Sequence, residues 1–395
     1  MSRESIMSPR NRHGAQWEFH LIDAVLAVLF VFRVAVPGPV VLPLSDVAAL
    51  VLIAIAACRR PQRSLLSTSW YVYGMVFLLV YLAVVAVVND IDPFRRLIRF
   101  AILAVLAGFI ASKRIDLRSM MIGVGVGLVL NTVLFYAGLA PDDYVGVLTG
   151  YLQDKNRAGL YFAIIPLLML VVVRPLWARI VILVAGAGAL YLTDSRTSMA
   201  AFVAAIIWLC VSGRLGGMFR ALLALAIYLA FNWSEDNLAE IGKYAARSGS
   251  DLLRSRIDAA ADIKVANAPW YGLGIGEGEV TVAGGQWLFH NSYQVLLVEG
   301  GWVMLVGVVA LFVVVGFGIG VGTGAPRVRT VEVIAIEAAT VATLLCALRL
   351  GEVFFTLPTF MMLGIGLLLI GEEHDAADRA AGGFARRRRI AANSA

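Results

Sequence analysis

Charged residues are scarce in this chain, and lysine is the scarcest of the four charged types. Only 15% of the 395 residues are Asp, Glu, Lys or Arg, whereas soluble domains average about 25%. Lysine occurs only at positions 113, 155, 243 and 264, so arginine supplies most of the positive charge. Hydrophobic residues make up 60% of the sequence. This composition excludes an ordinary soluble enzyme and a disordered protein, and it predicts a membrane protein.

Cysteines are few, and common metal and nucleotide motifs are absent. The three cysteines, Cys58, Cys210 and Cys346, lie in or beside apolar runs and form no CxxC pair. An odd number in such positions argues against a disulfide framework and against a zinc site. The sequence contains no HExxH, no GxSxG and no Walker lysine. We therefore expect neither a metal nor a cofactor.

Twelve apolar runs predict an all-α, polytopic fold with about twelve transmembrane helices. A helix needs about 20 apolar residues to cross the roughly 30 Å of hydrocarbon in a bilayer. The polar stretch Thr193–Thr197 is expected to separate two helices that would otherwise read as one run. The runs lie near residues 21–37, 40–57, 70–88, 97–112, 119–139, 159–173, 180–193, 197–212, 219–233, 294–322, 331–349 and 354–370.

The distribution of Lys and Arg predicts the orientation of these spans. With the N-terminus inside, the inner segments hold 20 of these residues and the outer segments hold 12. This bias favours a cytoplasmic tail at 1–20, a transmembrane domain at 21–370 and a basic cytoplasmic tail at 371–395. The segment 232–293 becomes a large extracytoplasmic loop. Within it, residues 251–262 read as a short amphipathic helix with Leu252, Leu253, Ile257 and Ala260 on one face.

Several arginines would lie at the outer ends of helices, where positive charge is disfavoured. Some of them should pair with nearby carboxylates, for which the candidates are Asp90, Asp92, Asp154, Asp194 and Glu352. Collectively they suit an anion, because a guanidinium matches phosphate oxygens and stays charged. A lipid diphosphate would lie at this depth. The residues are Arg33, Arg95, Arg96, Arg99, Arg157, Arg196 and Arg349.

Two arginines in the predicted loop helix differ in their expected pairing. Arg254 has Asp258 four residues later, a spacing typical of a surface ion pair. Arg256 has no carboxylate three or four residues away, so it is the better candidate for binding a ligand. Arg196, at the polar break between two apolar helices, is a second candidate, although Asp194 could neutralise it.

His290 is the only histidine on the predicted outer face, where it precedes the run at 294–322. The ordinary pKa of histidine makes His290 a ready base near neutral pH. By contrast, the glycines between Gly272 and Gly278 lack the context of a phosphate loop, and they predict only a flexible turn after Pro269 and Trp270.

These residues, taken together, resemble the motifs of the O-antigen ligase and polymerase superfamily. The similar stretches are Ser255-Arg256-Ile257, then Asn267 through Gly276, then His290-Asn-Ser-Tyr293 with Glu299-Gly300. Asp194-Ser-Arg196-Thr and Lys155-Asn-Arg157 are similar to two shorter family motifs. Gln294, where leucine is common, and Ala268, between Asn267 and Pro269, depart from the family pattern.

The resemblance implies metal-independent, inverting glycosyl transfer on the outer face of a bacterial inner membrane. The donor would be a polyprenyl-diphosphate-linked glycan, and the acceptor a hydroxyl on a glycan, lipid or protein. Membrane lipids would be the only other partners, with no nucleic acid. In this reading His290 is the catalytic base, and Arg196, Arg256 and Arg157 bind the donor diphosphate. The residues expected to orient the acceptor or support the base are Asn291, Tyr293, Glu299 and Arg254.

Other functions remain open from the sequence. A repeat-unit polymerase of the same superfamily would carry the same motifs, and a carboxylate such as Asp251, Asp258 or Glu299 could replace His290 at its centre. A lipid-linked glycan flippase would also need many spans and membrane arginines, but it would place them along a central cavity between two similar halves. A non-catalytic scaffold would leave His290 replaceable.

Overall fold

The computed structural model describes residues 20–37, 41–237, 248–321 and 329–393 of the chain. Within these ranges the fold is all-α apart from two short antiparallel hairpins. The hairpins are β1 (Ala35–Val36) with β2 (Leu42–Pro43), and β3 (Glu279–Val282) with β4 (Gly285–Leu288). The helices are α1 (Leu21–Val28), α2 (Leu44–Ala57), α3 (Ser69–Val88), α4 (Phe94–Ala111), α5 (Leu117–Tyr136), α6 (Lys155–Met169), α7 (Leu176–Leu192), α8 (Arg196–Val211), α9 (Gly217–Asn237), α10 (Ser248–Asn267), α11 (Ser292–Phe317), α12 (Val331–Cys346) and α13 (Leu357–Asn393).

Each of the twelve predicted apolar runs contains a helix, but the prediction of about twelve membrane spans is wrong. The short helices α2 and α7 have 14 and 17 residues, and at 1.5 Å per residue they fall short of the roughly 30 Å of a bilayer core. Helix α4 has 18 residues but carries three arginines in its first two turns. Five helical segments of the described chain are long and apolar enough to cross a membrane, namely Leu66–Val88, Leu117–Tyr136, Arg196–Arg214, Gly217–Ser234 and Ser292–Phe317.

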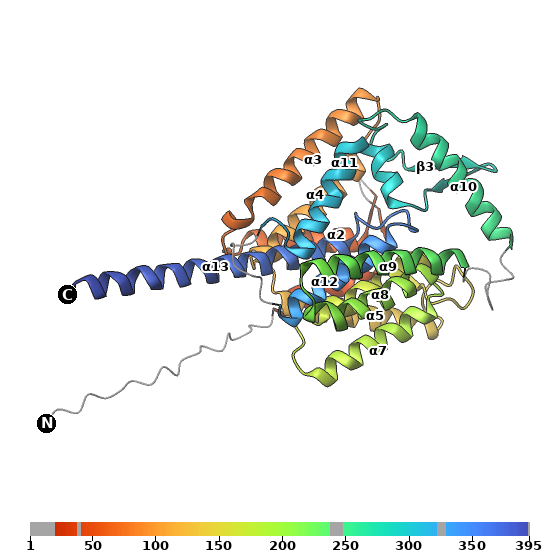
Figure 1. Ribbon diagram of the computed structural model, residues 1–395. Coiled ribbons are helices and arrows are strands. Elements are labelled where there is room, and N and C mark those ends of the chain that lie inside the picture. The colour runs from red at the N-terminus through yellow and green to blue at the C-terminus, as the bar shows by residue number, and fades with distance from the viewer. Residues whose placement is uncertain (1–19, 38–40, 238–247, 322–328, 394–395) are drawn as a thin grey trace.

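The connections between helices gather at two opposite ends of the molecule (Figure 1). The first, here called the termini end, contains residues 58–65, 112–116, 170–175 and 213–216, and α13 extends from it. Ion pairs of Arg59 with Asp23 and of Lys113 with Glu372 join its loops to α1 and α13. The second, here called the hairpin end, contains residues 32–37, 89–93, 137–154, 193–195, 268–291 and 347–356.

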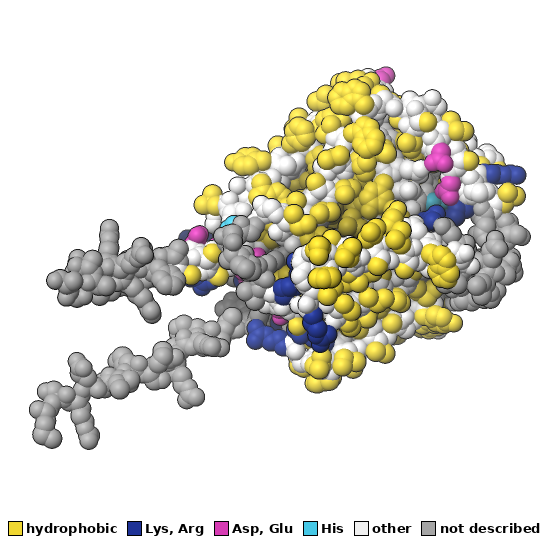
Figure 2. Space-filling model, viewed as in Figure 1, with side chains coloured by type: hydrophobic (Ala, Val, Ile, Leu, Met, Phe, Trp, Pro, Cys, Tyr) yellow, Lys and Arg dark blue, Asp and Glu magenta, His cyan; other side chains and the backbone are white. Residues whose placement is uncertain are grey.

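An apolar surface separates the two ends. Figure 2 shows hydrophobic side chains over the middle of one face, with charged side chains to its left and right. Helix α3 illustrates the pattern, because Met75, Leu78 and Leu82 are buried while Phe77 and Val80 on its other side are more than half exposed. Exposed apolar surface of this extent is characteristic of contact with lipid or a partner. Together with the five long helices, it indicates a membrane protein.

Helix α11 is kinked at Gly300 and Gly301, and the kink receives the glycine-rich turn. Gly301 has φ 61° and ψ −159°, a conformation that only glycine adopts readily. A Cβ atom there would lie 1.9 Å from the carbonyl oxygen of Trp270. The backbone amide of Trp302 donates to the same oxygen at 3.0 Å. The kink is therefore shaped to hold the segment that follows α10.

The predicted turn at 272–278 is confirmed as a turn, but hydrogen bonds to α11 hold it in place. The amide of Leu273 donates to the carbonyl of Val298, and the amide of Gly274 donates to the carbonyl of Glu299. The amide of Gly276 donates to Glu299 Oε1 at 2.9 Å. The turn fixes the chain between α10 and the β3–β4 hairpin, and so it positions both elements at the hairpin end.

The amphipathic helix predicted at 251–262 is confirmed and is longer, as α10. Ile257 lies on its buried side, as predicted, and Ala261 is buried with it, whereas Leu252 is exposed. The predicted tail at 371–395 continues α13 as far as Asn393. The predicted tail at 1–20 lies outside the described residues except for His20.

Candidate active site

The break between α7 and α8 places Arg196 at the hairpin end. Helix α7 ends at Leu192 and α8 begins at Arg196, as the polar stretch predicted. Asp194 adopts φ 53°, which turns the chain within three residues. The tip is secured by hydrogen bonds from Thr193 Oγ1 to the carbonyl of Leu190 and from Ser195 Oγ to Ser198 Oγ.

The start of α6 packs directly against this tip. Asp154 caps α6 by accepting hydrogen bonds from the amides of Asn156 and Arg157, each at 2.9 Å. A Cβ atom on Gly159 would lie 2.6 Å from the Cβ of Ser195, so only glycine permits the two helices to approach this closely. This packing brings the first residues of α6 beside Arg196.

Helix α10 faces the tip and carries a partner for His290. The Nδ1 atom of His290 lies 3.0 Å from Asp258 Oδ1. A carboxylate in this position favours the tautomer that carries its proton on Nδ1, which leaves the lone pair on Nε2. Asp258 thus gives His290 the orientation and the free nitrogen that a general base needs.

The α7–α8 tip, the start of α6, helix α10 and the end of the hairpin segment enclose a cleft, here called the basic cleft. Its volume is about 250 Å³. Arg196 contributes from α8, Arg254 from α10, and His290 from the end of the hairpin segment. The lining residues are Lys155, Asn156, Asp194, Ser195, Arg196, Thr197, Leu253, Arg254, Ile257, Trp287 and His290.

Positive charge dominates the basic cleft. Lys155, Arg196 and Arg254 bring three cations to it, and Asp194 is the only carboxylate among its described lining residues. Cations clustered in a partly buried site favour an anion, and guanidinium groups match the geometry of phosphate oxygens. The arrangement can therefore bind a phosphorylated ligand beside an imidazole base.

Two residues predicted to bind the donor lie elsewhere. Arg256 is exposed on α10 and does not line the basic cleft. Arg157 turns away from it, because its Nη2 atom lies 3.2 Å from Glu352 Oε2. The predicted ion pair between Arg254 and Asp258 is wrong, since within the described structure Asp258 pairs with His290. Arg254 instead lines the cleft.

Two predicted acceptor-orienting residues have structural contacts. Asn291 caps α11, where its side-chain oxygen accepts from the amides of Tyr293 and Gln294. The Tyr293 hydroxyl donates to the carbonyl of Leu344 at 2.9 Å, which ties α11 to α12. Both residues therefore hold the start of α11, directly after His290, in place.

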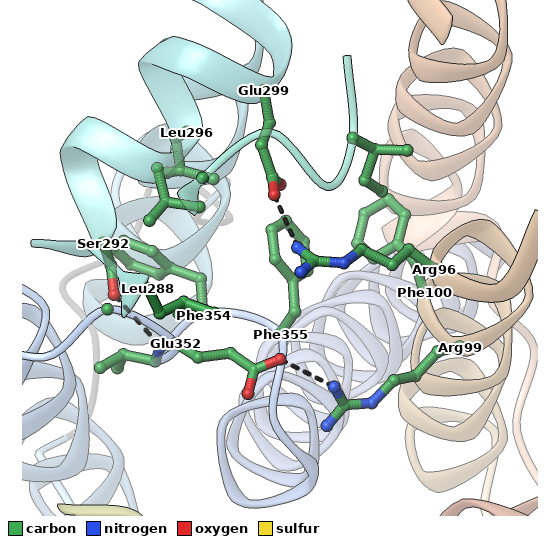
Figure 3. Close-up of a pocket in the computed structure, with 15 residues that line it drawn as sticks. Arg96, Arg99, Phe100, Leu288, Ser292, Leu296, Glu299, Glu352, Phe354 and Phe355 are labelled. Atoms are coloured by element: carbon green, nitrogen blue, oxygen red, sulfur yellow. Dashed lines mark hydrogen bonds and ion pairs between the residues drawn. The ribbon is translucent and has the colours of Figure 1, made fainter. Parts of the chain in front are cut away.

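Glu299 lies in a second, smaller pocket shown in Figure 3. This pocket has a volume of about 50 Å³. Glu299 is buried and pairs with Arg96 at 2.7 Å, while Arg96 also reaches Glu279 at 3.3 Å. With its bond from Gly276, Glu299 joins the kink of α11, the glycine turn and α4. It does not line the basic cleft.

Glu352 forms the centre of an arginine cluster that borders the small pocket (Figure 3). It pairs with Arg99 at 2.8 Å and with Arg157 at 3.2 Å, and Arg99 also lies 3.0 Å from Asp46. The sequence-based expectation that some of these arginines pair with Glu352 is thereby confirmed for Arg99 and Arg157.

Burial and charge interactions in this cluster shift the pKa values of Glu352 and Arg33. Burial alone would raise the pKa of Glu352, but Arg99, Arg157 and Arg33 outweigh it and lower that pKa to about 2. Burial lowers the pKa of Arg33 to about 10, and the positive charges of Arg157 and Arg99 act in the same direction. The cluster is therefore a dense group of like charges held together by Glu352 and Asp46.

Several site residues were not identified from the sequence. Asp258 was considered only as an alternative to His290, because a contact across 32 residues leaves no local spacing pattern. Trp287 and Lys155 were not placed in the site for the same reason, since their positions depend on how the hairpin and α6 pack. For Lys155 the sequence does offer a local signal, because Asp154 directly before it is a helix-capping residue that marks the start of α6.

In comparisons with known proteins, no protein-family model matches this chain, and no curated protein matches it.

Proposed function

We propose that the chain is a glycosyltransferase that moves a glycan from a polyprenyl-diphosphate carrier to an acceptor hydroxyl, in the manner of an O-antigen ligase. The observation that carries this proposal is the basic cleft, where the His290–Asp258 pair lies beside three cations. The similarity of the surrounding motifs to those of that superfamily supports the same reaction.

The proposed reaction is a single displacement. The acceptor oxygen attacks the anomeric carbon while His290 Nε2 takes the hydroxyl proton. The new bond forms as the bond from the anomeric carbon to the diphosphate breaks, and its electron pair leaves with the polyprenyl diphosphate. Attack from the face opposite the leaving group inverts the configuration at that carbon. Arg196, Arg254 and Lys155 stabilise the departing charge, a role that elsewhere a metal can fill.

The size of the basic cleft limits what it holds. Its volume of about 250 Å³ lies just below the range of about 300–1,000 Å³ that is typical of ligand pockets. It therefore suits the diphosphate and the first sugar, with the polyprenyl chain against the apolar surface and the rest of the glycan outside. Trp287, which also lines the cleft, offers an aromatic face for a sugar ring.

The reaction is proposed for the extracytoplasmic face of a bacterial inner membrane. The hairpin end, with the cleft, would face outward, and both termini would be cytoplasmic. The excess of Lys and Arg in the segments at the termini end supports this orientation.

The test uses a strain that lacks the chain, complemented with the wild type, His290→Ala or His374→Ala. His374 is the matched control, because it lies on α13 and contacts the carbonyl of Val321, away from the cleft. Polyprenyl-diphosphate glycans are extracted, sized and assigned to a leaflet. With His290→Ala, long glycans should persist in the outer leaflet, while the wild type and His374→Ala should clear them.

Three outcomes would contradict ligase activity. Accumulation of single repeat units would indicate a polymerase of the same superfamily. Accumulation in the inner leaflet, or full rescue by His290→Ala, would reject glycosyl transfer and favour a flippase or a scaffold.

A further inference from the structure

A large pocket opens at the termini end, opposite the basic cleft. Its volume is about 790 Å³, and it lies where the segment after α2, the α4–α5 connection, the segment after α6, α12 and α13 meet. Pockets of this size accommodate a complete small ligand or a lipid head group. Among the residues that the structure describes, five Lys and Arg side chains line it, namely Arg59, Arg60, Lys113, Arg114 and Arg174.

Three of these cations are already engaged. Arg59 makes two hydrogen bonds of 2.8 Å to Asp23. Lys113 pairs with Glu372 at 2.6 Å. Arg114 donates to the carbonyls of Ala57 and Arg59, where it satisfies the end of α2. These contacts are structural and leave little capacity for a ligand.

Arg60 and Arg174 are different. Both side chains are exposed, and neither has an ion-pair partner in the part of the chain that the structure describes. The pocket's carboxylates are also occupied, since Glu332 faces Arg179, Glu372 faces Lys113, and Asp116 caps α5. Two positive charges at the mouth of the pocket therefore remain without compensation.

The deeper wall of the pocket is apolar. Ile115, Leu117 and Leu368 line it and are buried, whereas the two arginines are exposed. A site with cations at its mouth and hydrocarbon beneath them matches an amphiphile, whose phosphate lies at the mouth and whose chains lie against the wall. A free phosphate would gain nothing from the apolar wall.

We propose that this pocket binds the phosphate-bearing head group of an anionic phospholipid. Basic pockets between membrane helices on the cytoplasmic side are suited to such head groups. The proposal rests on the membrane orientation given above, but it does not depend on glycosyl transfer. The site is distinct from the basic cleft, because the two lie at opposite ends of the molecule and share no lining residue.

The test measures phosphatidylglycerol binding to the full chain in detergent by native mass spectrometry, with phosphatidylcholine as the uncharged reference. The wild type is compared with the double variant Arg60→Gln, Arg174→Gln. Arg214→Gln is the matched control, because Arg214 is exposed at the same end and, within the described residues, bonds only to the carbonyl of Cys210. Each arginine should contribute about fivefold to binding. The double variant should therefore lose at least tenfold in phosphatidylglycerol affinity, while Arg214→Gln should stay within twofold of the wild type.

Inorganic phosphate is added in a second arm to distinguish the two sources of the anion. The proposal expects no competition at millimolar phosphate, because the apolar wall contributes to lipid binding. Competition by phosphate alone would overturn the lipid assignment. Equal binding by the double variant and the control, or equal binding of phosphatidylcholine, would overturn the site. Loss of glycosyl transfer with normal lipid binding would reject only the proposed enzyme activity, so the two failures can be told apart.

Discussion

At the scale of single residues, the contact between His290 and Asp258 is the centre of the proposed mechanism. Its length of 3.0 Å is that of a hydrogen bond that fixes an imidazole ring and its tautomer. Neither residue is fully buried, since their side chains are 28% and 48% exposed. His290, which lines the cleft, therefore remains accessible to an acceptor that enters it.

Asp258→Asn should lower turnover by about 10–100-fold, the usual effect of removing a carboxylate that orients a functional histidine. The amide can present its oxygen or its nitrogen to Nδ1, so the tautomer is no longer fixed. Asp262→Asn is the matched control, because Asp262 lies one turn later on α10 and accepts from Gln294 Nε2 at 2.6 Å. Steady-state kinetics of both variants would check this, and equal effects would reduce Asp258 to a structural role.

The lowered pKa of Glu352 predicts that the free energy of unfolding decreases at acidic pH. Its pKa is lowered from 4.5 to about 2 in the folded chain. The carboxylate therefore stabilises the fold fully above about pH 4.5, and this contribution is lost as the pH falls toward 2. Removing one partner from a buried ion pair costs about 3–5 kcal/mol, and the 31% exposure of the Glu352 side chain favours the lower end of that range.

Thermal unfolding of the wild type and of Glu352→Gln, measured in detergent from pH 7 to pH 3, would check this. The variant should be destabilised by about 3 kcal/mol at pH 7, and the difference should shrink steadily below pH 4.5. A difference that is constant across this range would contradict the charge-based account of the arginine cluster.

The sequence indicated which residue types matter, but not which of them meet. The pairing of Arg99 and Arg157 with Glu352 could be predicted because buried charges need compensation. The pairing of Asp258 could not, since its helical spacing to Arg254 favoured a local contact that the fold does not use. Arg256 was favoured because it lacked local partners, yet its position on α10 leaves it outside the cleft lining.

At the scale of elements, the kink of α11 connects the long apolar helices to the cleft. It holds the glycine turn, which positions the β3–β4 hairpin that contains Trp287 and is followed by His290. Glycine is required at position 301 both for its positive φ and for the close carbonyl of Trp270.

Gly301→Ala should destabilise the chain by at least about 2 kcal/mol, from backbone strain and the clash together, and it should lower turnover by displacing the hairpin. Gly74→Ala is the matched control, because it lies in helix α3 and an added Cβ meets nothing within 4 Å. That change should be neutral or stabilising by up to about 1 kcal/mol. Melting temperatures of both variants would decide the matter, and similar values would contradict the role assigned to the kink.

Helix positions were the most predictable part of the fold, and helix lengths were the least. Apolar runs mark helices reliably because a helix satisfies its own backbone hydrogen bonds. They do not show where each helix ends, and so α2 and α7 were counted as spans although they are short. The polar break at Thr193–Thr197 was predicted correctly because five polar residues interrupt a long apolar run.

At the scale of the whole molecule, the two charged ends and the apolar surface between them define an axis (Figure 2). The sequence anticipated this division, because alternate connections fall at opposite ends of a chain of antiparallel helices. It did not anticipate the basic cleft or the large pocket at the termini end, each of which depends on at least three elements that are distant in sequence.

The proposed orientation predicts the labelling of cysteines by a membrane-impermeant maleimide. Cys58 is exposed at the termini end, so in a Cys210→Ser background it should react only after the cells are permeabilised. Asp143→Cys, introduced at the hairpin end in a chain that lacks Cys58 and Cys210, should react in intact cells. The reverse pattern would place the basic cleft in the cytoplasm and contradict the orientation.

The most direct test of the account is the release of polyprenyl diphosphate by the purified chain. The donor is the lipid-linked glycan extracted from the strain that lacks the chain, and the assay is run with and without EDTA because the cleft cations are proposed to replace a metal. The wild type should turn over at the same rate with and without EDTA, and His290→Ala should be slower by about 10²–10⁴-fold, the usual contribution of a positioned base. Wild-type rates from His290→Ala, or loss of activity in EDTA, would contradict the central claim that His290 and a cationic cleft carry out metal-independent glycosyl transfer.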